Sequence, residues 1–231
     1  MKLLAFETAT EACSVALWID GDVRERFELA PRRHAEVSLP WAEALLAEAG
    51  IAKAQLDAIA VGRGPGAFTG VRLAIALAQG IAMALDRPVV PVSTLAALAI
   101  QAAGEHVLAA IDARMGEVYW GAFARAGDEV RATTPESVGP ARAIALPVGE
   151  TGWYGVGTGF AAGEGALRQH LGNKLAEVDA AALPHAADVA RLAASAFARG
   201  GALPAERLEP AYLRDNVALT LAEQQALRGS R

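Results

Sequence analysis

The chain has 231 residues, of which 53% are hydrophobic and 20% are charged, so it has the material for a packed core and is not a disordered chain. Acidic residues outnumber basic ones by 26 to 21, and the net charge of −5 disfavours a large nucleic-acid surface formed by this chain alone. One cysteine, Cys13, excludes an internal disulfide and a cysteine-based zinc site, and we expect it to be buried in a strand. The four histidines show no metal-binding spacing, so we expect no metal site.

No segment is predicted to cross a membrane. The longest apolar stretch, residues 73–85, contains Gln79 and Gly80 and is shorter than the roughly 18 residues of a spanning helix. The N-terminus reaches Glu7 before a signal-type apolar region could form. We therefore expect a cytoplasmic protein with no membrane partner.

Hydrophobic periodicity and turn residues predict the elements of the first half of the chain. Asp20-Gly21 suits a two-residue hairpin turn, and Gly50 suits a helix end. Pro40 lies inside the predicted helix 34–49 and indicates either a kink or a start near Ser38. The predicted elements are strands 2–8, 13–19 and 23–29, helix 34–49, strand 56–61, helix 71–85, strand 88–92 and helix 94–103.

The pattern restarts near residue 106, with almost no sequence identity between the halves. The predicted elements are strands 106–112, 117–124 and 129–133, a short helical stretch near 140–146, strand 153–157, helix 160–171, strand 175–178 and helix 188–199. Strands that alternate with helices favour an α/β protein. Two tandem βββαβαβα units, 1–105 and a degenerate 106–231, resemble the ribonuclease-H-like lobes of the actin, hexokinase and Hsp70 superfamily.

A glycine-rich loop, residues 62–70, follows a strand and opens a helix. It fits a dinucleotide fingerprint in part, but the acidic residue Asp86 precedes the next strand instead of ending it. No Gly-Lys-Ser/Thr follows, so the loop is not a Walker loop. Two interpretations stay open: a tight loop with positive-φ glycines and a helix capped by Thr69, or a loop that presents side chains to a partner. The side chains presented would be Arg63, Phe68 and Arg72.

The helix predicted over 71–85 is apolar on nearly every side, whereas a surface helix normally has one apolar stripe. It must be covered on both sides, by the core or by another chain. Trp41 lies away from the apolar stripe of its own helix, which adds to the case for a helical interface.

Polar turns follow the first strand of each unit. In an ATPase of this superfamily such turns hold phosphate and Mg²⁺, with a carboxylate for metal-bound water and glycine for close backbone approach. Here Glu7 stands for the usual Asp, Ala9 for the usual Gly, and Arg114 enters the second turn, so nucleotide turnover is disfavoured. Vestigial anion binding and a simple Asp112–Arg114 pair both stay open. The candidate turn residues are Glu7, Thr8, Thr10, Asp112, Arg114, Gly157 and Gly159.

Several motifs together carry a family resemblance. Residues 6–16 (FETATEACSVA), 62–72 (GRGPGAFTGVR), 91–95 (PVSTL), 110–119 (AIDARMGEVY) and 209–214 (EPAYLR) occur in the order found in the bacterial TsaB (YeaZ) family. The chain resembles that family from residue 1 to about 217; residues 131–150 and the tail after 218 match poorly.

The resemblance implies a role in making N6-threonylcarbamoyladenosine at position 37 of tRNAs that read codons beginning with A. The family is the non-catalytic partner of the transferase TsaD; the ATPase TsaE joins the complex, and tRNA is reached only through it. The family forms homodimers when TsaD is absent. The resemblance implies that no cofactor is required, and it allows weak binding of ATP or ADP. The implied TsaD interface lies on first-lobe helices, at Trp41, Leu45, Phe68, Arg72, Ile75 and Gln79.

Two other functions stay open from the sequence. One is an active nucleotide-dependent kinase or ATPase of the actin and hexokinase superfamily. The other is a nucleotide-binding sensor without turnover. No site supports the peptidase activity under which the family has also been classified.

Overall fold

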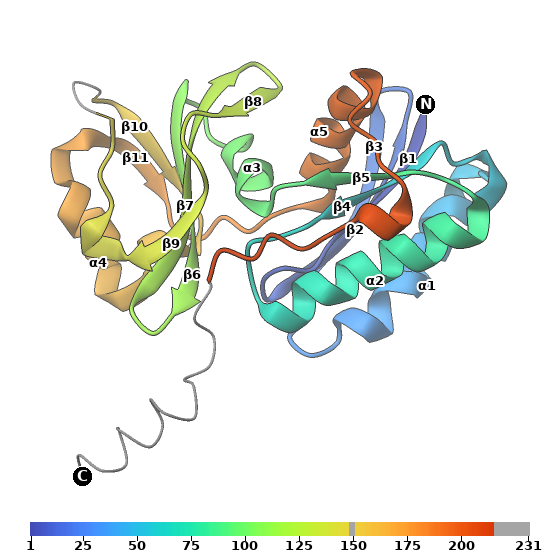
Figure 1. Cartoon of the computed structure of the whole chain (residues 1–231), viewed down its shortest axis with the longest axis horizontal. Coiled ribbons are helices and arrows are strands. Elements are labelled where there is room, and N and C mark those ends of the chain that lie inside the picture. The colour runs from blue at the N-terminus through green and yellow to red at the C-terminus, as the bar shows by residue number, and fades with distance from the viewer. Residues whose placement is uncertain (148–150, 215–231) are drawn as a thin grey trace, which may run out of the picture.

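The structure is a computed structural model that describes residues 1–147 and 151–214. Two β-sheets with helices form two lobes, which confirms the predicted α/β class and the two-lobe architecture (Figure 1). The predicted second lobe extends to residue 231, so its last 17 residues lie outside the described part of the chain.

The first sheet has the strand order β3-β2-β1-β4-β5. Strands β1 to β3 form an antiparallel meander, and β4 and β5 run parallel to β1. Strands β1 and β4 are almost wholly buried because helices cover both faces of the sheet, which explains their continuous apolar runs. The bounds are β1 (Lys2–Glu7), β2 (Ala12–Ile19), β3 (Asp22–Leu29), β4 (Ala58–Gly62) and β5 (Val89–Val92).

Three helices cover the first sheet. Helices α1 (His34–Ala49) and α2 (Phe68–Leu85) pack on its outer face, against β2 and β4 respectively. Helix α5 (Ala186–Ala198) packs on the opposite face, against β1 and β2. The first lobe is therefore a three-layer sandwich in which α1 and α2 form an outer layer.

The second sheet has the order β11-β10-β6-β7-β8, and β9 also pairs with β7. Helix α4 covers one face with a 3₁₀ turn, and α3 packs on β6 and β7 from the other side. The bounds are α3 (Thr94–Ala99), β6 (His106–Arg114), β7 (Glu117–Ala126), β8 (Glu129–Ala132), β9 (Ser137–Pro140), β10 (Trp153–Val156), α4 (Ala162–Leu171) and β11 (Leu175–Asp179). The 3₁₀ helices are η1 (Lys53–Gln55), η2 (Ala141–Ala143), η3 (Thr158–Phe160), η4 (Gly172–Lys174) and η5 (Ala205–Arg207).

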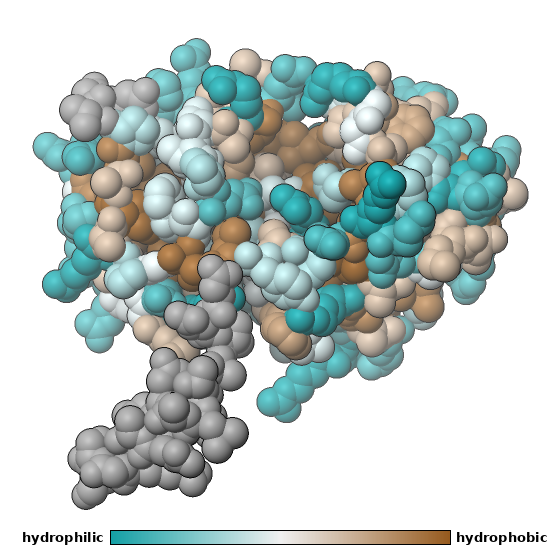
Figure 2. All heavy atoms as spheres, viewed as in Figure 1, coloured by the Kyte–Doolittle hydropathy of each residue, from teal (hydrophilic) through white to brown (hydrophobic). Residues whose placement is uncertain are grey.

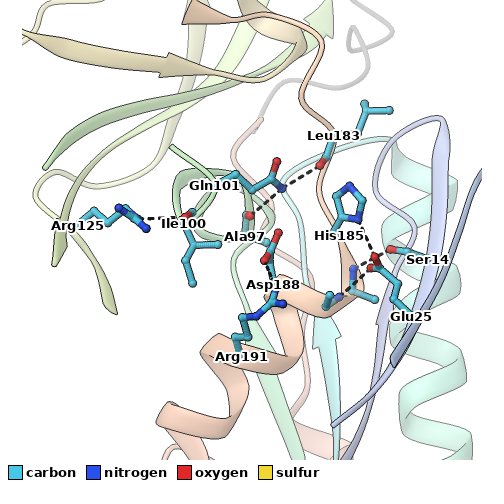
Figure 3. Close-up of polar contacts among 12 residues, drawn as sticks. Ser14, Glu25, Ala97, Ile100, Gln101, Arg125, Leu183, His185, Asp188 and Arg191 are labelled. Atoms are coloured by element: carbon cyan, nitrogen blue, oxygen red, sulfur yellow. Dashed lines mark hydrogen bonds and ion pairs between the residues drawn. The ribbon is translucent and has the colours of Figure 1, made fainter. Parts of the chain in front are cut away.

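Helices α3 and α5 exchange sheets. Each follows the last parallel strand of its own half but packs on the sheet of the other half, and the two helices contact each other between the sheets (Figure 1). The start of α5 is fixed by the first lobe: Ala186 N donates to Ser14 Oγ at 2.8 Å, and His185 Nδ1 lies 2.8 Å from Glu25 Oε2 (Figure 3). A division of the chain at residue 105 separates the strands, whereas α5 lies in the first lobe in space.

Several element predictions need correction. Helix α2 begins at Phe68, three residues early, with Ala67 at its N-cap and no side-chain cap, so Thr69 is not the cap. Helix α1 runs unbroken past Pro40, which excludes a start at Ser38. The stretch near 140–146 is strand β9 followed by a short 3₁₀ turn, where the first lobe has a full helix.

Candidate functional site

The carboxyl group of Glu7 ends β1 and is buried inside the first lobe. Its Oε1 accepts from Ala9 N at 2.7 Å, and its Oε2 accepts from Thr94 Oγ1 at 2.9 Å. A Cβ on Gly62 would lie 1.9 Å from Oε2, so the glycine makes room for the carboxyl group. Burial raises the pKa of Glu7 from 4.5 to about 7, against the opposing effect of these hydrogen bonds. Glu7 therefore does not face a ligand, contrary to its predicted place in an anion-binding turn.

The glycine-rich loop packs directly against the turn that follows β1. A Cβ on Gly66 would lie 2.4 Å from Ala9 O, and one on Gly70 would lie 2.0 Å from Thr8 O. Thr8 Oγ1 donates to Gly70 O at 2.7 Å, so Thr8 is also turned inward. Within the loop only Gly64 has a positive φ, of 92°. The glycines thus serve mainly the close approach of two backbones.

The second lobe repeats this arrangement. A Cβ on Gly157 would lie 2.3 Å from Ala110 O, and one on Gly159 would lie 2.6 Å from Ala110 Cβ. Two glycines after β10 therefore let the chain pack on β6, just as the loop after β4 packs on the end of β1. These two glycines thus allow a close approach of two backbones in the second lobe as well.

Asp112 and Arg114 form the pair that the sequence left open. Asp112 Oδ1 accepts from Arg114 N at 2.8 Å, and Oδ2 accepts from Arg114 Nη1 at 3.0 Å. Asp112 N also donates to Thr158 Oγ1 at 3.3 Å. Both carboxylate oxygens are engaged by one neighbouring residue, which closes the tip of the β6–β7 hairpin.

A cleft of about 820 Å³ lies between the lobes, with the turns after β1 and β6 on its two sides. It brings together five predicted site residues, Thr10, Phe68, Arg72, Asp112 and Arg114. Several other lining residues were not predicted as site residues, although the family motifs contain three of them. These are Tyr119, Thr158, Tyr212 and Arg214.

An aromatic and arginine stack stands at the mouth of this cleft. The guanidinium carbon of Arg72 lies 3.2 Å from the centroid of the Phe68 ring and 5.0 Å from that of Tyr212. Arg72 Nη2 also donates to the Tyr212 hydroxyl. Phe68 and Tyr212 are 63% and 59% exposed, so the stack is open to solvent.

Residues 208–214 cross from the first lobe to the second. Ala211 N donates to Arg63 O at 2.9 Å, and Arg214 Nη2 pairs with Glu117 and lies 3.3 Å from Ala113 O. The only sequence signal for this strap (residues 208–214) is the family motif at 209–214.

Helix α2 has one face in the core and an outer face that is also apolar. Ile75, 6% exposed, points into the core, and so does Leu45 of α1, at 2%. These two side chains therefore serve the core and offer almost no surface to a partner in the folded lobe, unlike their predicted place in the interface. The exposed side of α2 carries Ala76, Gly80 and Met83, of which Met83 is 69% exposed.

The other two predicted interface residues are half-buried. Trp41 packs against two groups of buried apolar residues, the outer core of the first lobe and a small cluster around Cys13 and Val37. Gln79 Nε2 donates to Ala205 O at 3.0 Å and to Leu208 O at 3.3 Å, so its amide holds the segment that leads into the strap.

Helix α2 is also longer than the sequence predicted. With 18 residues and a mean hydropathy of 1.6 it reaches the size of a membrane span by length and composition alone, and 28% of it is buried. In the folded lobe it packs on β4 and β1.

Apolar residues, brown in the space-filling view, reach the surface of both lobes among polar ones (Figure 2).

The remaining polar groups suggest no metal centre. Among residues 1–147 and 151–214, no three His, Cys, Asp or Glu side chains gather as a metal site would require. Cys13 is buried as expected, and its Sγ lies 3.4 Å from Ser38 Oγ.

A match to a protein-family model gives the class of protein to which the chain is similar. Residues 28–221 match the family model of TsaD, described as tRNA N6-adenosine threonylcarbamoyltransferase.

Individual related proteins identify the family within this class. TsaB of Escherichia coli K12, a tRNA threonylcarbamoyladenosine biosynthesis protein, is 43% identical, over 94% of this chain and 96% of the relative. TsaB of Haemophilus influenzae is 40% identical, over 94% and 95%. The solved structure of YeaZ from Pseudomonas aeruginosa superposes with a TM-score of 0.86 at 47% identity, over 92% of this chain and 99% of that one. The chain belongs to the TsaB (YeaZ) family.

Proposed function

We propose that this protein is a non-catalytic subunit that pairs with a TsaD-type transferase through the outer face of its first lobe. In that complex it takes part in forming N6-threonylcarbamoyladenosine at position 37 of tRNAs that read codons beginning with A. The names of its relatives support the pathway, since they are tRNA threonylcarbamoyladenosine biosynthesis proteins.

The outer face of α2 carries the proposal. Exposed or half-exposed residues recur along it at helical spacing, and nearly all are apolar or small. Small residues among larger apolar ones allow two helices to approach closely, as in a packed helical interface. The neighbouring helix α1 adds Leu39, which is 45% exposed. The stripe consists of Leu73, Ala76, Leu77, Gly80, Met83 and Ala84.

The carboxyl groups in the turns after β1 and β6 support a non-catalytic role. Glu7 is enclosed by the glycine loop and Thr94, and both oxygens of Asp112 are engaged by Arg114. Glu7 does not line the cleft, and Asp112 lines it with both oxygens already accepting from Arg114. A chain of this kind would act by holding its partner, with no group of its own at the reacting atoms.

The same proposal covers the partners and the place of action. TsaE joins the complex, a homodimer forms through the same face when TsaD is absent, and tRNA binds only to the complex. The protein acts in the cytoplasm and requires no cofactor of its own.

The test replaces exposed residues of the stripe, since a change at buried Ile75 would unfold the lobe. Met83→Asp and Ala76→Glu should each weaken binding to the TsaD protein of the same organism by about tenfold or more, because each buries a charge in an apolar interface. Both should also lower tRNA modification in a reconstituted reaction. Leu29→Asp is the matched control, because Leu29 is 58% exposed on β3, away from the stripe.

Two results would contradict the proposal. One is binding by both stripe variants as tight as that of the unmodified protein. The other is full tRNA modification by a variant that no longer binds TsaD, because a scaffold must bind in order to act.

Nucleotide binding is the second candidate, and the interlobe cleft favours it. A volume of about 820 Å³ is within the usual range for small ligands, and Thr10, Thr158 and Arg72 line it. Heat on titration with ADP would indicate a sensor. ATP hydrolysis by the isolated protein, reduced by Glu7→Ala or Asp112→Ala, would indicate a kinase or ATPase.

A further inference from the structure

The sulfur atoms of the chain lie in very different surroundings. The sequence contains one cysteine and three methionines. Cys13 is wholly buried, and burial raises the pKa of its thiol, so this group is shielded from oxidants and stays protonated. Met1 is half-buried and packs against the inner core of the first lobe. Met83 and Met115 are 69% and 89% exposed, so an oxidant in solution reaches both thioethers without unfolding the protein.

Met83 stands on the stripe along the outer face of α2. Among the larger side chains of the stripe, Leu73 and Leu77 are half-buried, whereas Met83 is exposed. Gly80 lies three residues earlier on the same side of the helix, and a Cβ built on it would meet no atom within 4 Å. The thioether therefore projects from an open and apolar part of the helix, and a chain that packs on the stripe buries it.

Met115 offers a contrast within the same chain. It lies between β6 and β7, at the tip of a hairpin of the second lobe, and is not part of the stripe. Its sulfur is at least as accessible as that of Met83. Oxidation at these two positions is therefore comparable in chemistry and different in place.

We propose that Met83 is an oxidation site through which peroxide controls docking of the partner on α2. The sulfur lone pair attacks one oxygen of hydrogen peroxide, so that a sulfur–oxygen bond forms and the oxygen–oxygen bond breaks. The departing hydroxide takes up the proton of the transferred hydroxyl group and becomes water. Sulfur loses two electrons and peroxide gains them. A thiol-dependent reductase reverses the change, because two thiols become a disulfide while the sulfoxide oxygen leaves as water.

The effect on docking follows from polarity. A thioether is apolar, whereas a sulfoxide carries a polar oxygen whose burial without a hydrogen-bond donor is unfavourable. The neighbouring stripe residues Leu77, Gly80 and Ala84 have no polar side-chain atom to pair with the new oxygen. The oxidised protein therefore docks more weakly, and a docked partner in turn covers the sulfur. This inference rests on the proposed function, because it takes the stripe to be the docking surface.

The experiment oxidises the isolated protein with hydrogen peroxide, removes the peroxide with catalase, and then measures binding to the TsaD protein of the same organism. Mass spectrometry of peptides reports the added oxygen at each methionine. The oxidised unmodified protein should bind about tenfold more weakly, and so should oxidised Met115→Leu. Met83→Leu keeps an apolar side chain without the sulfur, so peroxide should leave its affinity unchanged. Methionine sulfoxide reductases of both stereospecificities, supplied with a thiol, should restore binding of the oxidised protein.

The outcomes separate this inference from the proposed function. If Met83→Leu loses affinity in peroxide as the unmodified protein does, the sensitive group lies elsewhere and the inference is wrong. It is also wrong if Met115 is oxidised while Met83 is not, or if oxidation lowers the melting temperature and so weakens binding by unfolding. If protein fully oxidised at Met83 binds normally while Met83→Asp binds weakly, the inference fails and the proposed interface stands. If Met83→Asp binds normally as well, the proposed interface itself is wrong.

Discussion

Glu7→Gln should remove a pH-dependent loss of stability that the buried carboxyl group imposes. Burial raises the pKa of Glu7 from 4.5 to about 7 in the folded protein. The folded state therefore holds this proton at pH values where the unfolded chain has released it, and stability falls as the pH rises from about 4.5 through about 7. At 1.36 kcal/mol per pKa unit, the loss is about 3 kcal/mol above pH 7.

The glutamine variant preserves the local contacts while it abolishes the titration. Its amide oxygen can accept from Ala9 N, and its amide nitrogen can donate to the Thr94 hydroxyl, which then acts as acceptor. Urea denaturation at about pH 5 and about pH 8, followed by tryptophan fluorescence, gives the free energy of unfolding. The variant should gain about 2 kcal/mol or more over the unmodified protein between these two pH values.

Other titrating groups cancel in this comparison because both proteins contain them. Glu105→Gln, which removes an exposed carboxyl group just before β6, is the matched control for the loss of one acidic side chain. Parallel pH dependences for Glu7→Gln and the unmodified protein would refute the assignment of a raised pKa to a desolvated Glu7.

Three further predictions follow from packing and hydrogen bonding. Gly70→Ala should lower the free energy of unfolding by about 3 kcal/mol in chemical denaturation, because its Cβ would lie 2.0 Å from a backbone oxygen. Gly80→Ala should raise it by about 0.5–1 kcal/mol, because alanine favours the helix and no atom lies within 4 Å of the added Cβ. Equal effects of the two would contradict the close-approach argument. The hydrogen bond that the His185 ring donates to the Glu25 carboxylate raises the pKa of His185, so this pair stabilises the fold below about pH 6.5 and loses its effect as the pH rises through the raised pKa. Glu25→Gln should therefore lower the unfolding free energy more at about pH 5.5 than at about pH 9, and a constant difference would argue against it. Ile75→Asp should lower the melting temperature sharply, because it buries an unpaired charge; an unchanged melting temperature would show that the side chain faces solvent.

The sequence by itself determined much of the local structure. Helix α1 has the predicted bounds, because its apolar residues recur at 3.6-residue spacing and Gly50 adopts the left-handed conformation that ends a helix. The opening meander is also as predicted, since Asp20-Gly21 forms its first turn. Periods and turns of this kind depend on neighbours in the chain, and a single sequence contains them.

The tertiary structure decided which of those residues face a partner. Helical periodicity places Ile75 and Met83 on an apolar helix but does not tell which side β4 and β1 cover, so the buried residue and the exposed one look alike. The same limit applies to Glu7, whose enclosure depends on Gly62 and Thr94, and to Tyr212, which meets Arg72 across 140 residues. Burial and the cleft arise from segments that are distant in the chain, because packing is fixed by the whole fold and not by local spacing.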